Sequence, residues 1–165
     1  MLFDLTDPRD IVATVVGARS RRLAEHRIEI EFDDDLPLVN VDSALVEESL
    51  GQLLDNAAKY SPSGSVISVA VRAQPGQASL SVSDRGVGLT PEEKRKLGLR
   101  SFRSERLRDS IPGSGLGFWI ASVFVRANGG RIEISSRGAG LGTTASIVLP
   151  ASWIDESDSA ALANE

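Results

Sequence analysis

VDSALVEESLGQLLDNAAKYSP, residues 41–62, combines the pattern of an amphipathic helix with a polar C-terminal end. Asp42 is placed to cap the first turn. Asn56, Lys59 and Tyr60 crowd the last turns before Pro62 stops the helix. One side of the predicted helix is apolar because hydrophobic residues recur at helical spacing: Leu45, Val46, Leu50, Leu53, Leu54 and Ala57.

A polar stripe runs beside this apolar side. Gln52, Asn56 and Lys59 stand at i, i+4 and i+7, so they project in one direction. A solvated flank has the same spacing and, on this pattern alone, is the commoner explanation. A binding surface is the alternative, and it needs support from elsewhere in the chain.

The segments around this helix alternate between helical and strand patterns. Residues 7–26 have helical spacing, with Pro8 after a possible Asp7 cap and arginines toward the end. Residues 116–130 predict a third helix, stopped by Gly129 and Gly130. Period-two alternation predicts the strands, which are residues 26–37, 65–73, 78–84, 131–135 and 143–150, with the turn QPGQ at 74–77 joining two of them.

This order of elements predicts an α/β (α+β) fold. Strands paired in hairpins and joined through helices favour a two-layer sandwich, in which three helices cover one face of a mixed sheet. We expect one domain over residues 1–150. Residues 151–165 are small, polar and acidic, which predicts a disordered tail.

The composition excludes several classes of protein. The 165 residues carry a net charge of -5, which argues against a nucleic-acid surface. The absence of cysteine excludes a disulfide scaffold and a cysteine nucleophile, and it fits a cytoplasmic location. No apolar run approaches the roughly 20 residues of a membrane span, so we expect no membrane contact by this chain.

Two glycine-rich stretches lie where ligands commonly bind. In VSDRGVGL, residues 82–89, a strand ends at Asp84 and turns through Gly86 and Gly88. Such a turn lets the backbone approach a flat or anionic ligand, although an ordinary Asp-initiated turn has the same residues. In IPGSGLGF, residues 111–118, glycines precede a helix and could present N–H groups to phosphate, or form a simple flexible loop.

Known nucleotide-binding motifs do not account for the second stretch. No Gly-Lys-Ser/Thr follows the glycines, which excludes a Walker A loop. The glycines also follow a long charged loop instead of a strand, which excludes the dinucleotide fingerprint.

Taken in order, LLDNAAKY, DRGVGL and GSGLGF are far more specific than any one of them. Over residues 3–150 the chain resembles the ATP-binding catalytic domain of sensor histidine kinases, which shares the Bergerat-type fold of DNA gyrase, Hsp90 and MutL. Residues 41–69 resemble most the potassium-sensor kinases of KdpD type.

The resemblance implies a role for each matching residue. On the helix, Asn56 matches the asparagine that coordinates Mg²⁺ against the ATP phosphates, and Lys59 the cation near the terminal phosphates, with Tyr60 close to the nucleotide. Asp84 matches the carboxylate that accepts a hydrogen bond from the adenine amino group. Thr143 matches a hydroxyl that supports this aspartate through water, with Thr144 as the alternative. The remaining implied contacts are the turn along the base, Gly86 and Gly88, and the phosphate loop, Gly113, Gly115, Leu116 and Gly117.

Several positions depart from the family pattern. Gln52 stands where the family usually has asparagine and ATP-hydrolysing relatives have a glutamate base. Because glutamine cannot take a proton from water, this favours phosphoryl transfer over hydrolysis. In the family, the loop that corresponds to residues 97–112 here is a lid with a pattern of phenylalanines before an arginine. Gly98 and Ser101 replace two of the expected phenylalanines, and only Phe102 and Arg103 fit.

Charge and side-chain size add two expectations around this lid. Its four arginines, Arg100, Arg103, Arg106 and Arg108, repel one another without an anion, so we expect the loop to order over a bound triphosphate. Phe118 and Trp119 replace smaller family residues, and we expect them to fill core or face a neighbouring domain.

The phosphoacceptor is expected outside this chain. His26 is the only histidine, and it begins a predicted strand instead of lying on a long acceptor helix. The resemblance therefore implies a fragment of a membrane-anchored receptor, partnered by a dimerisation and phosphoacceptor helical domain and indirectly by a response regulator. Two alternatives stay open: a serine kinase of anti-sigma type, and a nucleotide-binding interaction module without productive transfer.

Overall fold

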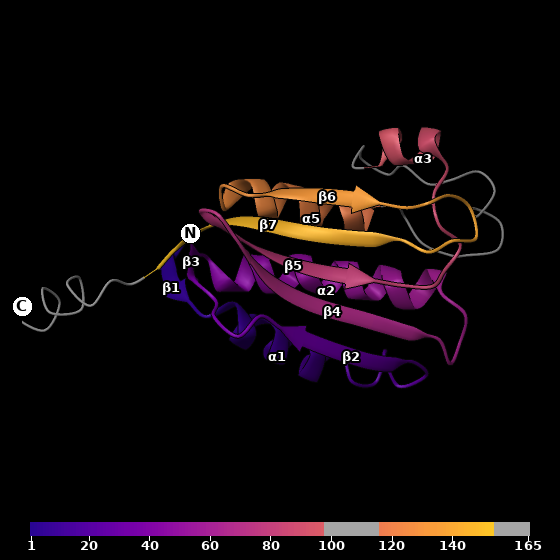
Figure 1. The fold of residues 1–165 in the computed structure, drawn as a ribbon, viewed down its shortest axis with the longest axis horizontal. Coiled ribbons are helices and arrows are strands. Elements are labelled where there is room, and N and C mark those ends of the chain that lie inside the picture. The colour runs from indigo at the N-terminus through magenta and orange to yellow at the C-terminus, as the bar shows by residue number, and fades with distance from the viewer. Residues whose placement is uncertain (98–115, 154–165) are drawn as a thin grey trace, which may run out of the picture.

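The structure is a computed structural model, which describes residues 1–97 and 116–153. Its strands and helices form two layers (Figure 1). The helices are α1 (Pro8–Ala18), α2 (Ser43–Tyr60), α3 (Pro91–Lys96) and α5 (Leu116–Ala127). The strands are β1 (Asp4–Thr6), β2 (Arg27–Phe32), β3 (Leu38–Val41), β4 (Val66–Gln74), β5 (Gln77–Ser83), β6 (Arg131–Ser135) and β7 (Thr144–Ser152).

The strands form one mixed sheet in the order β1-β3-β7-β5-β4-β2, with β6 paired to β7. Strand β2 runs parallel to β4, and the other pairs are antiparallel. Strands β4 and β5 form the predicted hairpin around Pro75 and Gly76, whose φ of 69° suits the second central position of a type II turn. The mixed sheet and the pairing of the last two strands, β6 and β7, are confirmed.

Helices α1, α2 and α5 lie on one face of the sheet, with α2 between the other two (Figure 1). Alternating residues of β4, β5 and β7 point at these helices, and Ile67, Leu80 and Ile147 are fully buried there. From α2, Leu50 and Leu54 are fully buried against them, each contributing about 1.5–3 kcal/mol. The predicted two-layer sandwich is therefore confirmed, and its core fixes the position of α2.

The helix termini follow local sequence rules. The Asp7 side chain accepts a hydrogen bond from the N–H of Arg9, and that of Asp42 accepts one from Leu45. Helix α5 ends before Gly129, which has a φ of 75° and costs little strain in that conformation. These predicted caps and this predicted stop are confirmed.

Helix α1 is shorter than predicted. It ends at Ala18, and residues 19–25 form turns. The side chain of Arg19 reaches α2, where its guanidinium lies over Gly51 and its Nε donates to Asp55 across 3.2 Å. The arginines assigned to the end of the helix therefore belong to the connection that follows it.

Three described elements were not predicted. Strands β1 and β3 have only 3 and 4 residues, and they are stabilised by pairing with each other and with the end of β7. Helix α3 begins with a capping box, in which the Thr90 side chain accepts from the Glu93 N–H and the Glu93 carboxylate accepts from the Thr90 N–H. The sequence TPEE carries the signature of this cap.

Several predictions fall outside the described residues. The lid arginines and Gly98 and Ser101 lie within 98–115, as do the expected ligand contacts Phe102, Arg103, Gly113 and Gly115. Most of the expected tail, residues 154–165, also lies outside them. Strand β7 continues past residue 150, because Ala151 and Ser152 pair with β3.

Candidate functional site

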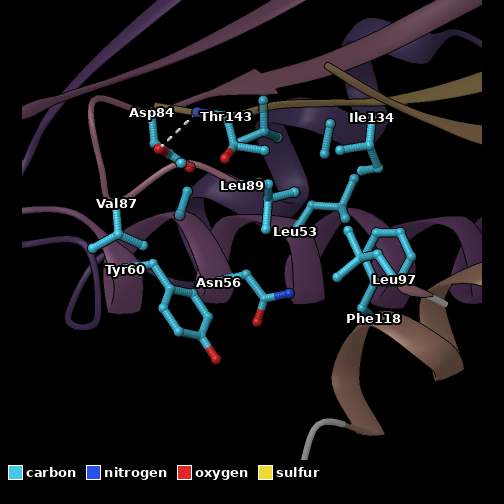
Figure 2. A pocket seen from close by; sticks show the side chains of 14 residues that line it. Leu53, Asn56, Tyr60, Asp84, Val87, Leu89, Leu97, Phe118, Ile134 and Thr143 are labelled. Carbon is cyan, nitrogen blue, oxygen red and sulfur yellow. Dashed lines mark hydrogen bonds between the residues drawn. The ribbon is translucent and has the colours of Figure 1, made fainter. Parts of the chain in front are cut away.

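A pocket opens between α2, the end of β5, the turn after it and the start of α5 (Figure 2). Its walls bring together residues more than 80 positions apart in the chain. The side chains labelled in Figure 2 show a polar end at Asp84 and Thr143 and an apolar end at Leu97 and Phe118. The lining residues are Leu53, Asn56, Ala57, Tyr60, Val82, Asp84, Val87, Gly88, Leu89, Leu97, Phe118, Ile134, Thr143 and Ala145.

Asp84 stands at the end of β5 and is held by backbone N–H groups. Its Oδ1 accepts from the Gly86 N–H at 2.8 Å and from the Thr143 N–H at 3.2 Å. No described residue donates to Oδ2. Burial raises the pKa of the Asp84 carboxyl above its usual value, and the two backbone hydrogen bonds lower it to a smaller extent. One carboxylate oxygen is thus fixed, and the other remains available to a ligand.

The structure distinguishes the two adjacent threonines. Thr143 lines the pocket beside Asp84, as Figure 2 shows. The Thr144 hydroxyl lies 2.8 Å from the Ser83 hydroxyl, and in a strand successive side chains point to opposite faces. Thr143, and not Thr144, therefore lies at the pocket.

The glycines of the turn after β5 are required by neighbouring backbone. A Cβ on Gly86 would overlap the carbonyl oxygen of Tyr60, at the end of α2. Gly88 has a φ of 64°, and a Cβ there would overlap the carbonyl oxygen of Gly138 in the β6–β7 loop. The Val87 N–H also donates to the Tyr60 carbonyl at 3.1 Å. The turn is thus packed against the C-terminal end of α2.

The side chains of the polar stripe on α2 do not all line the same pocket. Asn56 and Tyr60 line the pocket, and the Asn56 amide points into it in Figure 2. Lys59 instead lines a shallow hollow with Arg22, Asp55 and Ala58. Its Nζ lies 5.5 Å from the centroid of the Tyr60 ring. Lys59 is therefore close to the edge of the pocket without being part of its wall.

Gln52 lies one turn before Asn56 on α2 and is not part of the pocket wall. Its Nε2 donates to Glu48 Oε1 at 2.9 Å. Its Oε1 faces Gly117 in the first turn of α5, where a Cβ would crowd it. Gln52 and Gly117 are thus neighbours, and Leu116 begins the same helix without lining the pocket.

The apolar walls are what the sequence analysis missed. Leu53, Val87, Leu89, Leu97 and Ile134 line the pocket from separate elements, and nothing in their local sequence separates them from core residues. Phe118 packs against the core as expected, but it also lines the pocket. Its position in the first turn of α5 places it beside α2, so one side chain contributes both to the core and to the pocket wall.

The enclosed part of the pocket is about 120 Å³. Pockets that enclose a whole drug-sized ligand are roughly 300–1,000 Å³. The walls therefore suit one small, largely apolar group with a hydrogen-bonding edge at Asp84, and a larger ligand would extend beyond this enclosed part.

The described residues contain no cluster of three or more histidine, cysteine, aspartate or glutamate side chains that could hold a metal ion. Asn56, which lines the pocket, offers one neutral oxygen. A single amide oxygen is a weak ligand for Mg²⁺, which prefers oxygens from phosphates, carboxylates and water. A metal at Asn56 would therefore depend on a ligand that brings its own phosphates.

His26 has a structural setting. Its Nδ1 donates to the Ser65 carbonyl at 3.1 Å, beside the start of β2. His26 therefore lies in the connection before a strand and not on a helix. Among the residues that the structure describes, no helix has the length and apolar character to cross a bilayer.

The chain is similar in sequence to one family of ATPases and to sensor kinases within it. The profile of the histidine kinase-, DNA gyrase B- and HSP90-like ATPase family matches residues 41–152. Sensor protein KdpD of Clostridium acetobutylicum is 32% identical over 132 residues, which cover 79% of this chain and 15% of the relative. The signal transduction histidine-protein kinase/phosphatase MprB of Mycobacterium ulcerans is 37% identical over 150 residues, 87% of this chain and 29% of the relative.

The fold comparison agrees. The solved structure of a mycobacterial sensor histidine kinase MprB has a TM-score of 0.80 at 31% identity, covering 92% of this chain and 100% of that chain. The two curated relatives are similarly distant, so they do not single out the potassium-sensor type, which stays a prediction. This chain spans less than a third of either relative's length.

Proposed function

The chain belongs to the histidine kinase-, DNA gyrase B- and HSP90-like ATPase family, and we propose that it binds ATP beside Asp84 and transfers the γ-phosphoryl group to a histidine on a separate helical domain. It is a catalytic domain homologous to those of sensor histidine kinases. The assignment of its individual residues and of its acceptor is the proposal.

The proposal rests on the Oδ2 oxygen of Asp84, which accepts no hydrogen bond from a described residue and lies at the polar end of a largely apolar pocket. Oδ1 is occupied by the N–H groups of Gly86 and Thr143, and Oδ2 faces no donor among the described residues. The adenine amino group is a donor that fits this oxygen. Guanine carries a carbonyl at the same position, where two acceptors would repel each other. Asp84 therefore selects ATP over GTP.

The remainder of the nucleotide extends along α2. We assign Asn56 to Mg²⁺ and Lys59 to the terminal phosphates, with Tyr60 beside the ribose or base. Mg²⁺, when bound, neutralises phosphate charge and orients the phosphate oxygens. The Asn56 amide suits this role because it lines the pocket and makes no hydrogen bond to a described residue.

The same proposal assigns Gly86 and Gly88 to the turn beside the base, and Gly113, Gly115, Leu116 and Gly117 to the phosphate loop. Gln52, placed beside Gly117, orients the first turn of α5. Phe102 and Arg103 belong to the lid, with Arg103 contacting the γ-phosphate.

The transfer requires positioning more than proton abstraction. A neutral imidazole nitrogen attacks the γ-phosphorus, the bond to the β–γ bridging oxygen breaks, and ADP leaves with the electron pair. Gln52 cannot act as a general base toward water, because an amide does not accept a proton at neutral pH. The carboxylate of Glu48, one turn before Gln52 on α2, accepts a hydrogen bond from the Gln52 amide. The site thus favours transfer over hydrolysis.

The partners follow from the length of the relatives. This chain matches only part of each sensor kinase. We propose that a dimerisation and phosphoacceptor helical domain of the parent protein supplies the histidine, that a response regulator receives the phosphoryl group next, and that the chain works on the cytoplasmic side.

Phosphotransfer from γ-labelled ATP to a supplied acceptor-helix domain tests the proposal. Transfer to histidine gives a label that is lost in acid and retained in alkali. An acid-stable label would replace the histidine kinase with the serine kinase alternative. Nucleotide binding by calorimetry without any transferred label would leave an interaction module. The sensor-kinase relatives favour the first outcome.

A further inference from the structure

A second cleft lies beside the nucleotide pocket, between α3, α5 and β6. It has a volume of about 460 Å³. Its rim carries three basic side chains, from Lys94, Arg126 and Arg131, together with the hydroxyl of Ser122. Its apolar residues are Leu97, Phe118, Ile132 and Ile134. The cleft therefore combines a cationic rim with an apolar floor.

The charge of this rim is only partly neutralised. Arg131 forms an ion pair with Glu133 at 2.8 Å. Arg126 donates to the backbone carbonyl of Ser122 at 3.4 Å. Within the described residues, neither Arg126 nor Lys94 has a carboxylate partner. This local positive charge contrasts with the net charge of -5 of the whole chain.

The chain itself contains a segment of complementary chemistry. The twelve residues that follow Trp153 are IDESDSAALANE, which carry four acidic side chains and no basic one. Apolar Ile154 and Leu162 accompany these charges. A segment of this composition gains charge-assisted contacts at a basic rim and can bury its few apolar side chains on an apolar floor.

The path from the sheet to the cleft is short. Arg131, the first residue of β6, pairs with Val148 of β7. Strand β7 then ends at Ser152, so the beginning of β6 and the end of β7 lie at the same end of the sheet (Figure 1). Twelve extended residues reach roughly 40 Å. The acidic segment is therefore long enough to turn back to Arg131 and continue along the cleft.

We propose that the cleft between α3, α5 and β6 binds an acidic, partly apolar peptide segment, and that residues 154–165 of this chain are that segment. The cleft shares Leu97, Phe118 and Ile134 with the nucleotide pocket. Docking of the segment would therefore stabilise side chains that form the apolar end of that pocket. This inference rests on the charges of the cleft and does not depend on the proposed kinase activity.

The absence of cysteine allows a direct test in the full chain. Ser159→Cys introduces a single thiol that accepts a nitroxide spin label within the acidic segment. Paramagnetic broadening of backbone amides, measured on ¹⁵N-labelled protein, then reports which residues the segment approaches. We expect strong broadening of the amides of Ser122, Arg126 and Ile132, and its decrease as added salt screens the charges.

Charge-reversed variants identify the cleft as the cause. Lys94→Glu with Arg126→Glu should abolish the broadening. Arg21→Glu with Arg95→Glu is the matched control: it changes the net charge equally, and both arginines are exposed and lie outside the cleft lining. It should leave the broadening unchanged. The amide spectrum of each variant shows whether it is folded.

Neutralising the acidic side chains of the segment tests the proposal independently of the cleft variants. Asp155→Asn, Glu156→Gln and Asp158→Asn together should remove the broadening while the cleft stays intact. The proposal is overturned if no cleft amide broadens, if both charge-reversed pairs act alike, or if the neutralised segment broadens the same amides. Broadening found only between labelled and unlabelled molecules in a mixture would assign the segment to a second copy and also overturn it.

Discussion

Asp84 and Thr143 are joined by two backbone-anchored hydrogen bonds. The Asp84 N–H donates to the Thr143 carbonyl at 2.9 Å, and the Thr143 N–H donates to Asp84 Oδ1 at 3.2 Å. This pair ties the end of β5 to the residue before β7 and fixes the direction of the carboxylate. The proposed recognition of adenine at Oδ2 would therefore use a prearranged acceptor, which lowers the cost of ordering on binding.

Asp84→Asn should weaken ATP binding about ten- to a hundredfold, or about 1.5–3 kcal/mol, the usual loss for a hydrogen bond to a charged group. The asparagine retains an oxygen for the two N–H groups, but presents its NH₂ to the adenine amino group. Calorimetric titration of ATP and GTP measures the effect.

Asp34→Asn is the matched control, because Asp34 is exposed and lies outside the pocket lining. It should bind ATP as the wild type does. Equal affinities of the wild type for ATP and GTP, or an unchanged ATP affinity in folded Asp84→Asn, would remove Asp84 from its assigned role.

The raised pKa of Asp84 makes the stability of the nucleotide-free protein depend on pH. Well below 3.8, the usual aspartate pKa, the folded and unfolded states both carry the proton. As pH rises above that value, the unfolded state loses the proton first, so the folded state is penalised until pH exceeds the raised pKa. Asp84→Asn removes this penalty.

The difference in unfolding free energy between Asp84→Asn and the wild type should therefore shift in favour of the variant as pH rises through this window, and then level off. Denaturant titrations at a series of pH values measure it, because the other titrating groups cancel in the difference. A difference that is constant with pH would contradict the burial of this carboxylate.

Asn56→Ala should weaken Mg²⁺-dependent ATP binding and abolish phosphoryl transfer, while the fold survives. The Asn56 side chain lines the pocket and makes no hydrogen bond to a described residue, so its removal leaves no buried partner unsatisfied. Titrations with and without Mg²⁺ measure the loss. Asn40→Ala, at an exposed position of β3, is the control. Full transfer activity in Asn56→Ala would exclude Asn56 from the site.

Gly86→Ala should lower the free energy of unfolding by about 1–3 kcal/mol, because the new methyl group would overlap the Tyr60 carbonyl and force the backbone to move. Gly17→Ala is the contrasting substitution. It lies inside α1 with nothing near the new Cβ, so it should stabilise the protein by about 0.5–1 kcal/mol. Urea unfolding of both variants measures whether each substitution lowers or raises the free energy of unfolding. A neutral Gly86→Ala would contradict the close packing of this turn on α2.

Thr143→Val and Thr144→Val should separate binding from stability. Thr143 lines the pocket, so loss of its hydroxyl should weaken ATP binding by about 0.5–1.5 kcal/mol, the usual contribution of a neutral hydrogen bond. Thr144→Val removes the partner of the Ser83 hydroxyl on the opposite face and should leave ATP affinity unchanged. Calorimetry and thermal unfolding on both variants measure the two effects. Reversed behaviour would place Thr144 at the ligand.

Local rules predicted much of the fold. The caps at Asp7 and Asp42, the Pro75–Gly76 turn and the stop of α5 depend on residues within one or two turns of each other. The same rules failed where a partner far away in the chain decides the outcome. Strands β1 and β3 exist because they pair across the sheet. Helix α1 ends at Ala18, and Arg19, just after it, donates to Asp55 of α2, 36 residues farther along the chain.

The candidate site divides in the same way. The sequence by itself determined the polar candidates for the site, because Asn56, Asp84 and the glycines after it occur in a specific order. Only the tertiary structure decided that Thr143 faces the pocket, that Lys59 lies beside its wall, and that Phe118 forms part of it. Motifs specify the type of side chain at a site. The direction of each side chain depends on strand register and helix packing, which form between residues that are distant in the chain.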